Sequence, residues 1–431
     1  MASHPQKWLQ DFVAAAESRE TLPLNPVVGR LKDLIEGRTD LCMWASAMFL
    51  EVPNKVPYNT ADGSFESLIR DHRHMIDLLN IITEEVVPDW TMSVPAFGLS
   101  LIGLPFQAIF DWPMGTPSGH AFFLDREVNK IIKAILDTWR DNLLATSRSL
   151  TAITTKSGGW LSNEAIAAME QPANFHDERR YTFQELYVCD PGSDPIHWGF
   201  RSWDDFFVRR FRDMDAVRPV AHRDKSAWVV NACESRPVAI KKHIKEYDKF
   251  WLKGTNYSVA DMLGHHPMAQ DFVGGTMYQA VLKTTAYHRW HAPVSGYVIF
   301  AKTIQGAYFS ERSTNGLFSE PILPPHYDQV YLCHVATRTI VFIQADQPVG
   351  LLCFVAIGIA DVSTCEISPR LMGSWPQRVE KGEEIGMFRY GGSSYCLLFR
   401  KDLELAFVEK AQPGRENTGI AIRSPLAFAN A

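Results

Sequence analysis

The sequence predicts an α+β fold in which a helical N-terminal region packs on a β-rich C-terminal domain. Apolar residues recur at three- and four-residue intervals up to about residue 180. From about residue 225, short runs rich in β-branched and aromatic residues alternate with turn residues. At 431 residues the chain exceeds the size at which one core usually keeps growing. We therefore expect a helical domain at 1–180 and a β-rich domain at 181–431.

Four segments of the N-terminal region show the helical spacing: 8–13, a segment opened by Asn25-Pro26, 64–87 and 127–144. Between the last two, residues 111–119 are rich in proline and glycine, which predicts a turn-rich loop. We expect this loop to pack Trp112 between helices, in preference to a functional role of its own.

The strand-like runs of the C-terminal region lie at 228–230, 238–240, 296–300, 339–343 and 351–357. Glycine, proline, asparagine and aspartate separate them, as expected of turns between strands. One helical stretch, 258–263, interrupts the series, and the sequence contains no internal repeat and no low-complexity linker.

Composition excludes several classes of protein. The net charge of −6 and the absence of a basic block argue against nucleic-acid binding. The seven cysteines are scattered, odd in number and without a C-x-x-C pair, which favours reduced thiols in a cytoplasmic protein. No run reaches the roughly 20 apolar residues of a membrane span, and the N-terminus does not resemble a secretory signal. We expect a cytoplasmic protein without stable membrane insertion.

Ser393 is the candidate nucleophile. It follows Gly391-Gly392, and glycine lets a base approach the backbone closely because it has no Cβ. A serine hydroxyl needs a base within hydrogen-bond reach, and the densest histidine pair is His288 and His291. Each motif has a plain alternative: a hairpin turn for the glycine-serine segment, and a hydrogen-bonded core or surface pair for the histidines. A metal site is disfavoured, because no third ligand stands at a suitable spacing.

Five ordered stretches resemble motifs of the phosphatidylserine decarboxylase family of pyruvoyl enzymes. They are 202–209 with Arg218-Pro219, Lys253-Gly254 with Tyr257-Ser258, 287–291, 381–388 and 391–394. The resemblance implies a decarboxylase-like catalytic domain in which the chain cuts itself between Gly392 and Ser393. Ser393 would then become a covalent pyruvoyl group, which accepts electrons as CO₂ leaves.

The resemblance also implies roles for the histidines. His291 would be the base for self-cleavage, and His288 would act in the decarboxylation step. Cleavage would leave a β chain, 1–392, and an α chain, 393–431, as each other's partners.

The sequence departs from the family pattern at two places. Gly391 replaces the usual leucine, which loosens the turn before the cleavage site. Glu234, in the turn 232–235, stands where the family has an aspartate that orients the histidine. Glu234 is therefore the expected orienting carboxylate, and a surface glutamate is its alternative.

Further similarity, at 111–117, 285–293 and 363–366, is to a fungal branch of aromatic amino acid decarboxylases. It implies a free amino acid substrate, with L-tryptophan decarboxylated to tryptamine and CO₂. One alternative is phosphatidylserine, converted to phosphatidylethanolamine. Others are an unprocessed, non-catalytic binding module and a pyridoxal phosphate enzyme, for which no lysine stands in a convincing context.

Overall fold

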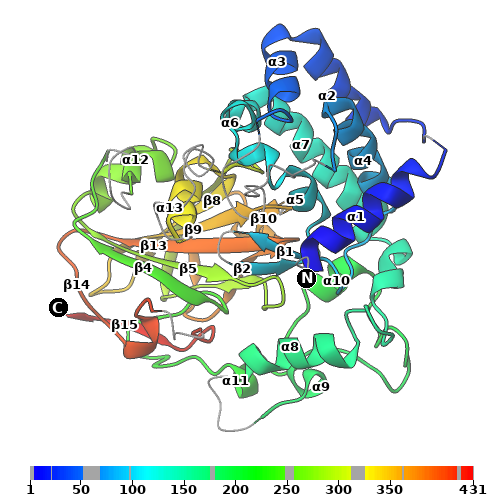
Figure 1. Ribbon diagram of the computed structural model, residues 1–431. Coiled ribbons are helices and arrows are strands. Elements are labelled where there is room, and N and C mark those ends of the chain that lie inside the picture. The colour runs from blue at the N-terminus through cyan, green and yellow to red at the C-terminus, as the bar shows by residue number, and fades with distance from the viewer. Residues whose placement is uncertain are drawn as a thin grey trace.

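The computed structural model describes residues 4–20, 22–51, 68–96, 99–174, 180–247, 257–311, 326–361, 364–414 and 419–430 (Figure 1). It confirms the α+β prediction, because helices dominate the first half and antiparallel sheets the second. The division at residue 180 stays a prediction. Among the described residues, no helix combines the length and the apolar character needed to cross a membrane.

The first half contains α1 (His4–Glu17), α2 (Pro26–Gly37), α3 (Thr39–Ala47), α4 (His72–Glu85), α5 (Pro105–Phe110), η1 (Pro113–Gly115), α6 (Pro117–Leu124), α7 (Arg126–Trp139), η2 (Arg140–Leu144), η3 (Ser147–Ala152) and α8 (Asn163–Ala173). Local chemistry fixes several starts: Asn25 caps α2, and Asp71 caps α4 by accepting the N–H groups of Arg73 and His74. The short helices α9 (Phe183–Leu186), α10 (Trp203–Phe207) and α11 (Met214–Val217) lead to the sheets.

The structure of this half differs from the sequence prediction at two places, and a third prediction is tested only in part. Residues 111–119 are not a loop, since they contain η1 and the start of α6, although Trp112 is buried as expected. A hairpin of β1 (Ser93–Ala96) and β2 (Leu99–Ile102) was not predicted. The helix expected at 64–87 begins at His72, and residues 64–67 lie outside the described residues.

The main sheet has seven antiparallel strands, in the order β11 (Gln377–Val379), β7 (Gly296–Ile304), β8 (Arg338–Ala345), β9 (Leu351–Ile359), β13 (Gly392–Phe399), β5 (Thr276–Leu282) and β4 (Arg236–Lys242). Two smaller sheets have the orders β10 (Thr364–Ile367), β12 (Glu384–Arg389), β6 (Arg289–His291) and β14 (Glu404–Phe407), β15 (Pro425–Asn430), β3 (Trp228–Val230). The remaining elements are α12 (Val259–Met262), η4 (Pro267–Phe272), α13 (His326–Val335), η6 (Pro369–Leu371) and η7 (Glu409–Ala411).

These elements confirm the predicted strand runs. Each of the five runs falls within a strand (β3, β4, β7, β8 and β9), and the predicted helical stretch contains α12. Because side chains alternate along a strand, β13 contributes to two cores. Tyr395, Leu397 and Phe399 pack in one, while Cys396 and Leu398 pack in the larger core that includes the N-terminal helices.

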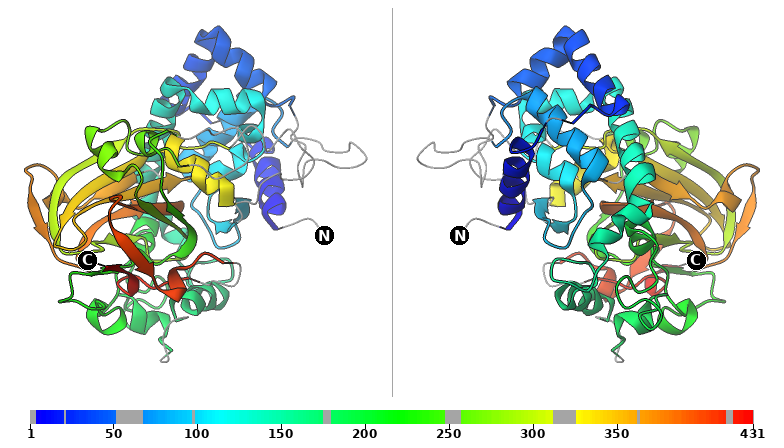
Figure 2. Two further views of the ribbon diagram at one scale, coloured as in Figure 1. Left: turned by 90° about the vertical axis from the view of Figure 1, so that its left-hand side faces the viewer. Right: turned by 90° about the vertical axis from the view of Figure 1, so that its right-hand side faces the viewer.

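Helices α1–α7 lie together against one side of the sheet region, whereas α8 lies apart from them, beside α9 and α11 (Figures 1 and 2). Asp361, just after β9, joins the two parts: the oxygens of its buried carboxyl group accept the backbone N–H groups of Phe106 and Gln107 in α5, at 3.1 and 2.9 Å. The ring of Trp139 in α7 also packs against Tyr390, with 6.0 Å between centroids. The helical region therefore contacts the chain just before the candidate cleavage site.

Candidate active site

Gly392 and Ser393 begin β13, in the interior of the seven-stranded sheet. Ser393 pairs with Leu282 on β5 and with Gly358 on β9, and it is 1% exposed. Tyr390 and Gly391 precede it with φ angles of 61° and 89°, in the left-handed region that favours glycine. The alternative of a simple hairpin turn is wrong, because β12 and β13 belong to different sheets.

His288 is the imidazole that the fold brings to Ser393. The Ser393 Oγ and His288 Nδ1 atoms are 3.5 Å apart, and His288 Nε2 lies 3.1 Å from the carbonyl oxygen of Thr284. A carbonyl only accepts, so Nε2 carries the proton and Nδ1 presents its lone pair to the serine hydroxyl. This is the tautomer that a base for Ser393 needs, and the distance is at the long end, as is common before a reaction.

The surroundings keep His288 neutral and fixed. Burial, with the Arg209 guanidinium as a second cause, lowers the pKa of His288 from 6.5 to about 3. The ring of Phe207 stacks on the imidazole, with centroids 4.2 Å apart. Arg209 also donates hydrogen bonds to the carbonyl oxygens of Thr285 and Ala286, at 2.5 and 3.2 Å. Phe207 and Arg209, both within the stretch 202–209, thus hold the loop that carries His288.

His291 has a different set of neighbours. Its Nδ1 lies 2.7 Å from the carbonyl oxygen of Gly382, so Nδ1 carries the proton and Nε2 accepts from the Tyr287 hydroxyl at 3.2 Å. Burial is the main cause that lowers the pKa of His291 from 6.5 to about 3. His288 immediately precedes β6 and His291 ends it, and residues three apart on extended chain face opposite sides. Among the described hydrogen bonds of the two imidazoles, only that of His288 reaches Ser393.

The turn that carries Glu234 is hydrogen-bonded to the backbone of His291. The His291 N–H donates to the carbonyl oxygen of Ala232 at 2.9 Å, so the turn 232–235 packs against the strand that carries His291. The Glu234 carboxylate, however, forms an ion pair with Arg218, the buried arginine of the Arg218-Pro219 stretch. The guanidinium of Arg218 also donates to the carbonyl oxygen of Ala173 in α8. Glu234 is thus part of an ion pair at the junction with α8, and not a surface residue.

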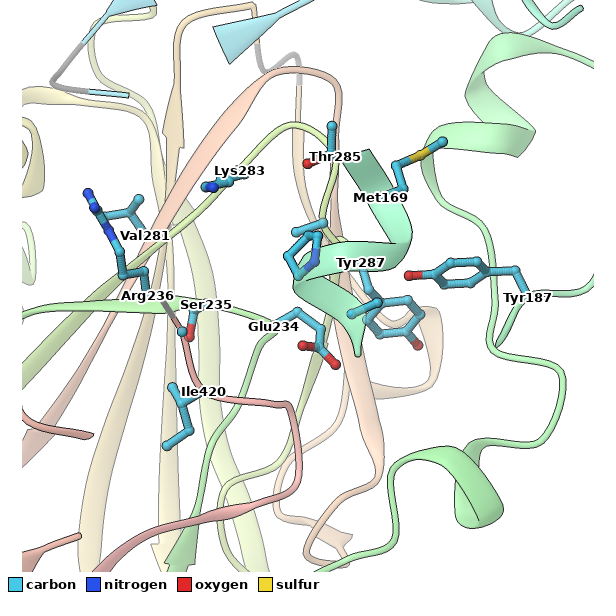
Figure 3. Close-up of a pocket in the computed structure, with 14 residues that line it drawn as sticks. Met169, Tyr187, Glu234, Ser235, Arg236, Val281, Lys283, Thr285, Tyr287 and Ile420 are labelled. Atoms are coloured by element: carbon cyan, nitrogen blue, oxygen red, sulfur yellow. The ribbon is translucent and has the colours of Figure 1, made fainter. Parts of the chain in front are cut away.

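A narrow pocket lies next to these residues, between α8 and the strands β4 and β5 (Figure 3). Its cavity volume is about 50 Å³. Met169, Tyr187 and Tyr287 lie on one side of it in Figure 3, and Arg236 and Lys283 on the other. The remaining lining residues are Pro172, Ala173, Glu234, Ser235, Val281, Thr285, Ala286, Gly419 and Ile420. Because Val281 pairs with Ser394 on β13, the pocket opens one strand away from the cleavage site.

Sequence reasoning missed three contributors: Arg209, Tyr287 and Thr284. Arg209 and Tyr287 stand within stretches that carried the resemblance, so their position was a signal, although their partners were not predictable. Thr284 acts through its carbonyl oxygen, which any residue would supply, and no sequence signal marks it. Lys253-Gly254, part of the same resemblance, lie outside the described residues.

Comparisons with known proteins show the family to which the chain is similar. Two family models, both described as phosphatidylserine decarboxylase, match residues 25–169 and 203–418. A protein named decarboxylase iboD from Amanita muscaria is 36% identical over 323 residues, which cover 73% of this chain and 88% of the relative. An L-tryptophan decarboxylase from Psilocybe cubensis is 32% identical over 366 residues, covering 81% and 78%. A phosphatidylserine decarboxylase proenzyme from Oryza sativa is 25% identical, covering 67% and 45%.

Proposed function

The chain belongs to the phosphatidylserine decarboxylase family and is a carboxy-lyase, and we propose that it decarboxylates a free aromatic L-amino acid through a pyruvoyl group. The proposed reaction converts L-tryptophan to tryptamine and CO₂. One observation carries the proposal: the hydroxyl of Ser393, the residue that follows Gly392, faces the unprotonated Nδ1 of the buried, neutral His288.

The chain would generate the group from its own backbone. The Ser393 hydroxyl loses its proton to a base and attacks the carbonyl carbon of Gly392, which moves the acyl group from nitrogen to oxygen. Removal of the Ser393 α-proton then breaks the Cβ–O bond, releasing Gly392 as a carboxylate and leaving dehydroalanine. Hydrolysis of its imine tautomer releases ammonia and leaves the pyruvoyl group. The buried Ser393 beside His288 fits this origin.

The pyruvoyl carbonyl would supply the electron sink for loss of CO₂. The chain's own residues would supply position and proton control at the same place. His288, held by Phe207 and by the carbonyl oxygen of Thr284, has an uncharged acceptor nitrogen aimed at residue 393. Enclosure of Ser393 excludes bulk water, which strengthens the electrostatic interactions there.

The proposal leaves two ways to divide self-cleavage and decarboxylation between His288 and His291. The resemblance gives self-cleavage to His291 and decarboxylation to His288, whereas the hydrogen bonds favour His288 as the first acceptor of the Ser393 proton. A positioned base contributes about 10²–10⁴-fold, so loss of the acting base should slow the cut by that factor. Time courses of the cut in His288→Ala and His291→Ala distinguish the two assignments, because only one variant should lose this rate.

The aromatic substrate is supported by the relatives named for L-tryptophan, which match most of this chain. The alternative substrate is phosphatidylserine, which the family description and the Oryza sativa relative favour. The seven cysteines are all free, which is typical of proteins in a reducing compartment, and we therefore propose a cytoplasmic location.

The decisive experiment combines mass spectrometry with a substrate panel. The purified chain should separate under denaturing conditions into fragments 1–392 and 393–431, the latter blocked by a pyruvoyl terminus. It should release CO₂ from tryptophan, and Ser393→Ala should abolish both the cut and the activity. Release of CO₂ from phosphatidylserine alone would overturn the substrate assignment, and an active chain with an intact Ser393 would overturn the mechanism. Ser394→Ala is the matched control for the nucleophile.

A further inference from the structure

Tyr390, two residues before Gly392, has a backbone conformation that is unusual for a bulky residue. Its φ angle is 61°, and Gly391 continues the left-handed bend with a φ of 89°. Glycine adopts this region freely, whereas a large side chain there is a genuine outlier. The bend takes the chain from β12, in a three-stranded sheet, to β13, in the seven-stranded sheet. Contacts of the Tyr390 side chain must therefore hold the backbone in this shape.

Three aromatic rings pack against the side chain of Tyr390, which is buried. Its ring centroid lies 5.3 Å from that of Trp203 and 6.0 Å from those of Trp139 and Phe207. The Tyr390 hydroxyl is also buried, and it has no hydrogen-bond partner among the residues that the structure describes. Since the ring makes the contacts and the hydroxyl adds none of these, packing of the ring holds the bend.

The short helix α10 supplies most of these contacts. Trp203 and Phe207 both belong to it, and Asp204 accepts a hydrogen bond at 2.5 Å from Arg389, the last residue of β12. Phe207 also stacks on His288, with centroids 4.2 Å apart. One helix therefore contacts both the bend before the cleavage site and the imidazole that faces the nucleophile.

We infer that Tyr390 is a positioning residue for self-cleavage: its ring, held by α10 and α7, fixes the bend that sets Ser393 opposite His288. The Ser393 Oγ and His288 Nδ1 atoms are 3.5 Å apart, at the limit of a hydrogen bond, so a small shift at the start of β13 would remove the contact. The inference rests on the proposed function, because the bend matters for chemistry only if the Ser393 hydroxyl attacks Gly392. Its structural part, the ordering of residues 391–393 by the ring, can be measured in a chain that lacks this hydroxyl.

The structural part is tested by amide hydrogen exchange in the Ser393→Ala chain. Tyr390→Gly suits the positive φ but removes all three ring contacts, whereas Tyr390→Phe keeps the ring and removes only the hydroxyl. We expect exchange at residues 391–393 to be at least about tenfold faster in Tyr390→Gly and unchanged in Tyr390→Phe. Residues 397–399, at the far end of β13, should exchange at the parental rate in both variants. Tyr390→Leu, which keeps apolar bulk without the ring, should change exchange in the same direction and covers the case in which the glycine variant does not fold.

In the chain that retains Ser393, hydroxylamine traps the ester formed by the attack on Gly392. It displaces the Ser393 oxygen from the carbonyl carbon and returns a proton to that oxygen. The products are a hydroxamic acid on Gly392 and an unmodified serine at the start of 393–431, which mass spectrometry distinguishes from a pyruvoyl terminus. A misplaced reacting group can cost about 10²-fold in rate, so Tyr390→Gly should slow formation of the hydroxamic acid at least about tenfold. Tyr390→Phe should react at the parental rate.

Phe200→Leu is the control for a general loss of packing. Phe200 is buried against Phe206 of α10, with centroids 5.2 Å apart, and no described ring contact joins it to Tyr390 or His288. This variant should have a lower urea midpoint than the parent, because it loses a buried ring, and still form the hydroxamic acid at the parental rate.

Parental exchange at residues 391–393 in both Tyr390→Gly and Tyr390→Leu would overturn the inference, and so would a parental rate of trapping in these variants. Slow trapping in Tyr390→Phe would also overturn it, because the hydroxyl and not the ring would then be the acting group. If exchange changes as expected but the parent forms no hydroxamic acid and never cuts itself, the ordering of the bend by Tyr390 stands and the proposed function fails.

Discussion

The two buried histidines predict a specific dependence of stability on pH. His288 and His291 each have a pKa of about 3 in the folded chain and 6.5 when unfolded. Between these values the unfolded chain binds protons that the folded chain does not, so the free energy of unfolding falls as the pH falls below 6.5. We propose to measure this in the Ser393→Ala chain, in which no cleavage interferes.

The magnitude follows from the size of the shifts. One pKa unit corresponds to about 1.4 kcal/mol, but the unfolded histidine is only half protonated at pH 6.5. Going from pH 6.5 to 5.0 should therefore cost about 1.6 kcal/mol per histidine, or about 3 kcal/mol for the pair. Asp361 acts in the opposite direction, because burial raises its pKa to about 8, so differences between variants are the informative quantity.

The assay is urea unfolding at both pH values. Glutamine fills a similar volume and cannot be protonated, so His288→Gln and His291→Gln should each reduce the pH-dependent loss by about 1.6 kcal/mol. His265→Gln is the control, since the His265 side chain is 63% exposed. If both variants keep the full pH dependence of the parent, the two imidazoles are not buried in neutral form, and the acid–base reasoning for this site fails.

Three further predictions follow from single contacts. Gly382→Ala should lower the free energy of unfolding by about 1–3 kcal/mol, because it adds strain at a positive φ and a clash with Val220; an unchanged urea midpoint would contradict this. Between pH 5 and 7 the folded Asp361 carboxyl keeps its proton and the unfolded one does not, so its contribution to the free energy of unfolding should fall by about 1.4 kcal/mol for each unit that the pH rises. Asp361→Asn should remove this contribution, and an equal pH dependence of urea unfolding in the variant and the parent would refute the prediction. Phe207→Leu should slow self-cleavage about tenfold by removing the ring stacked on His288, and a time course on denaturing gels at parental rate would count against that role.

The sequence predicted elements whose causes are local. Asn25-Pro26 opens α2 because the Asn25 side chain caps the helix, and the apolar run at 351–357 lies within β9. The turn-rich reading of 111–119 was wrong because proline also suits the first turn of a helix, as in η1 and α6. Local composition alone does not decide between these two uses of proline.

The partners within the site depend on pairing across the sheets, which the sequence does not specify. Ser393 meets His288 because β13 lies between β5 and β9, and the chain between β5 and β6 returns over its end. A hairpin turn was the alternative for the segment 391–394, but β12 pairs with β6 and β13 with strands of the main sheet. The choice of Arg218 as the partner of Glu234 likewise depends on how α11 and α8 are packed.

The position of β13 has a consequence for the protein after a cut. A strand bonded along both edges cannot peel away from its neighbours without exposing a row of unpaired amides in the middle of a sheet. A nicked molecule should therefore sediment, unfold and be degraded as one body. Its smaller piece should exchange with added peptide of the same sequence only when the entire sheet opens.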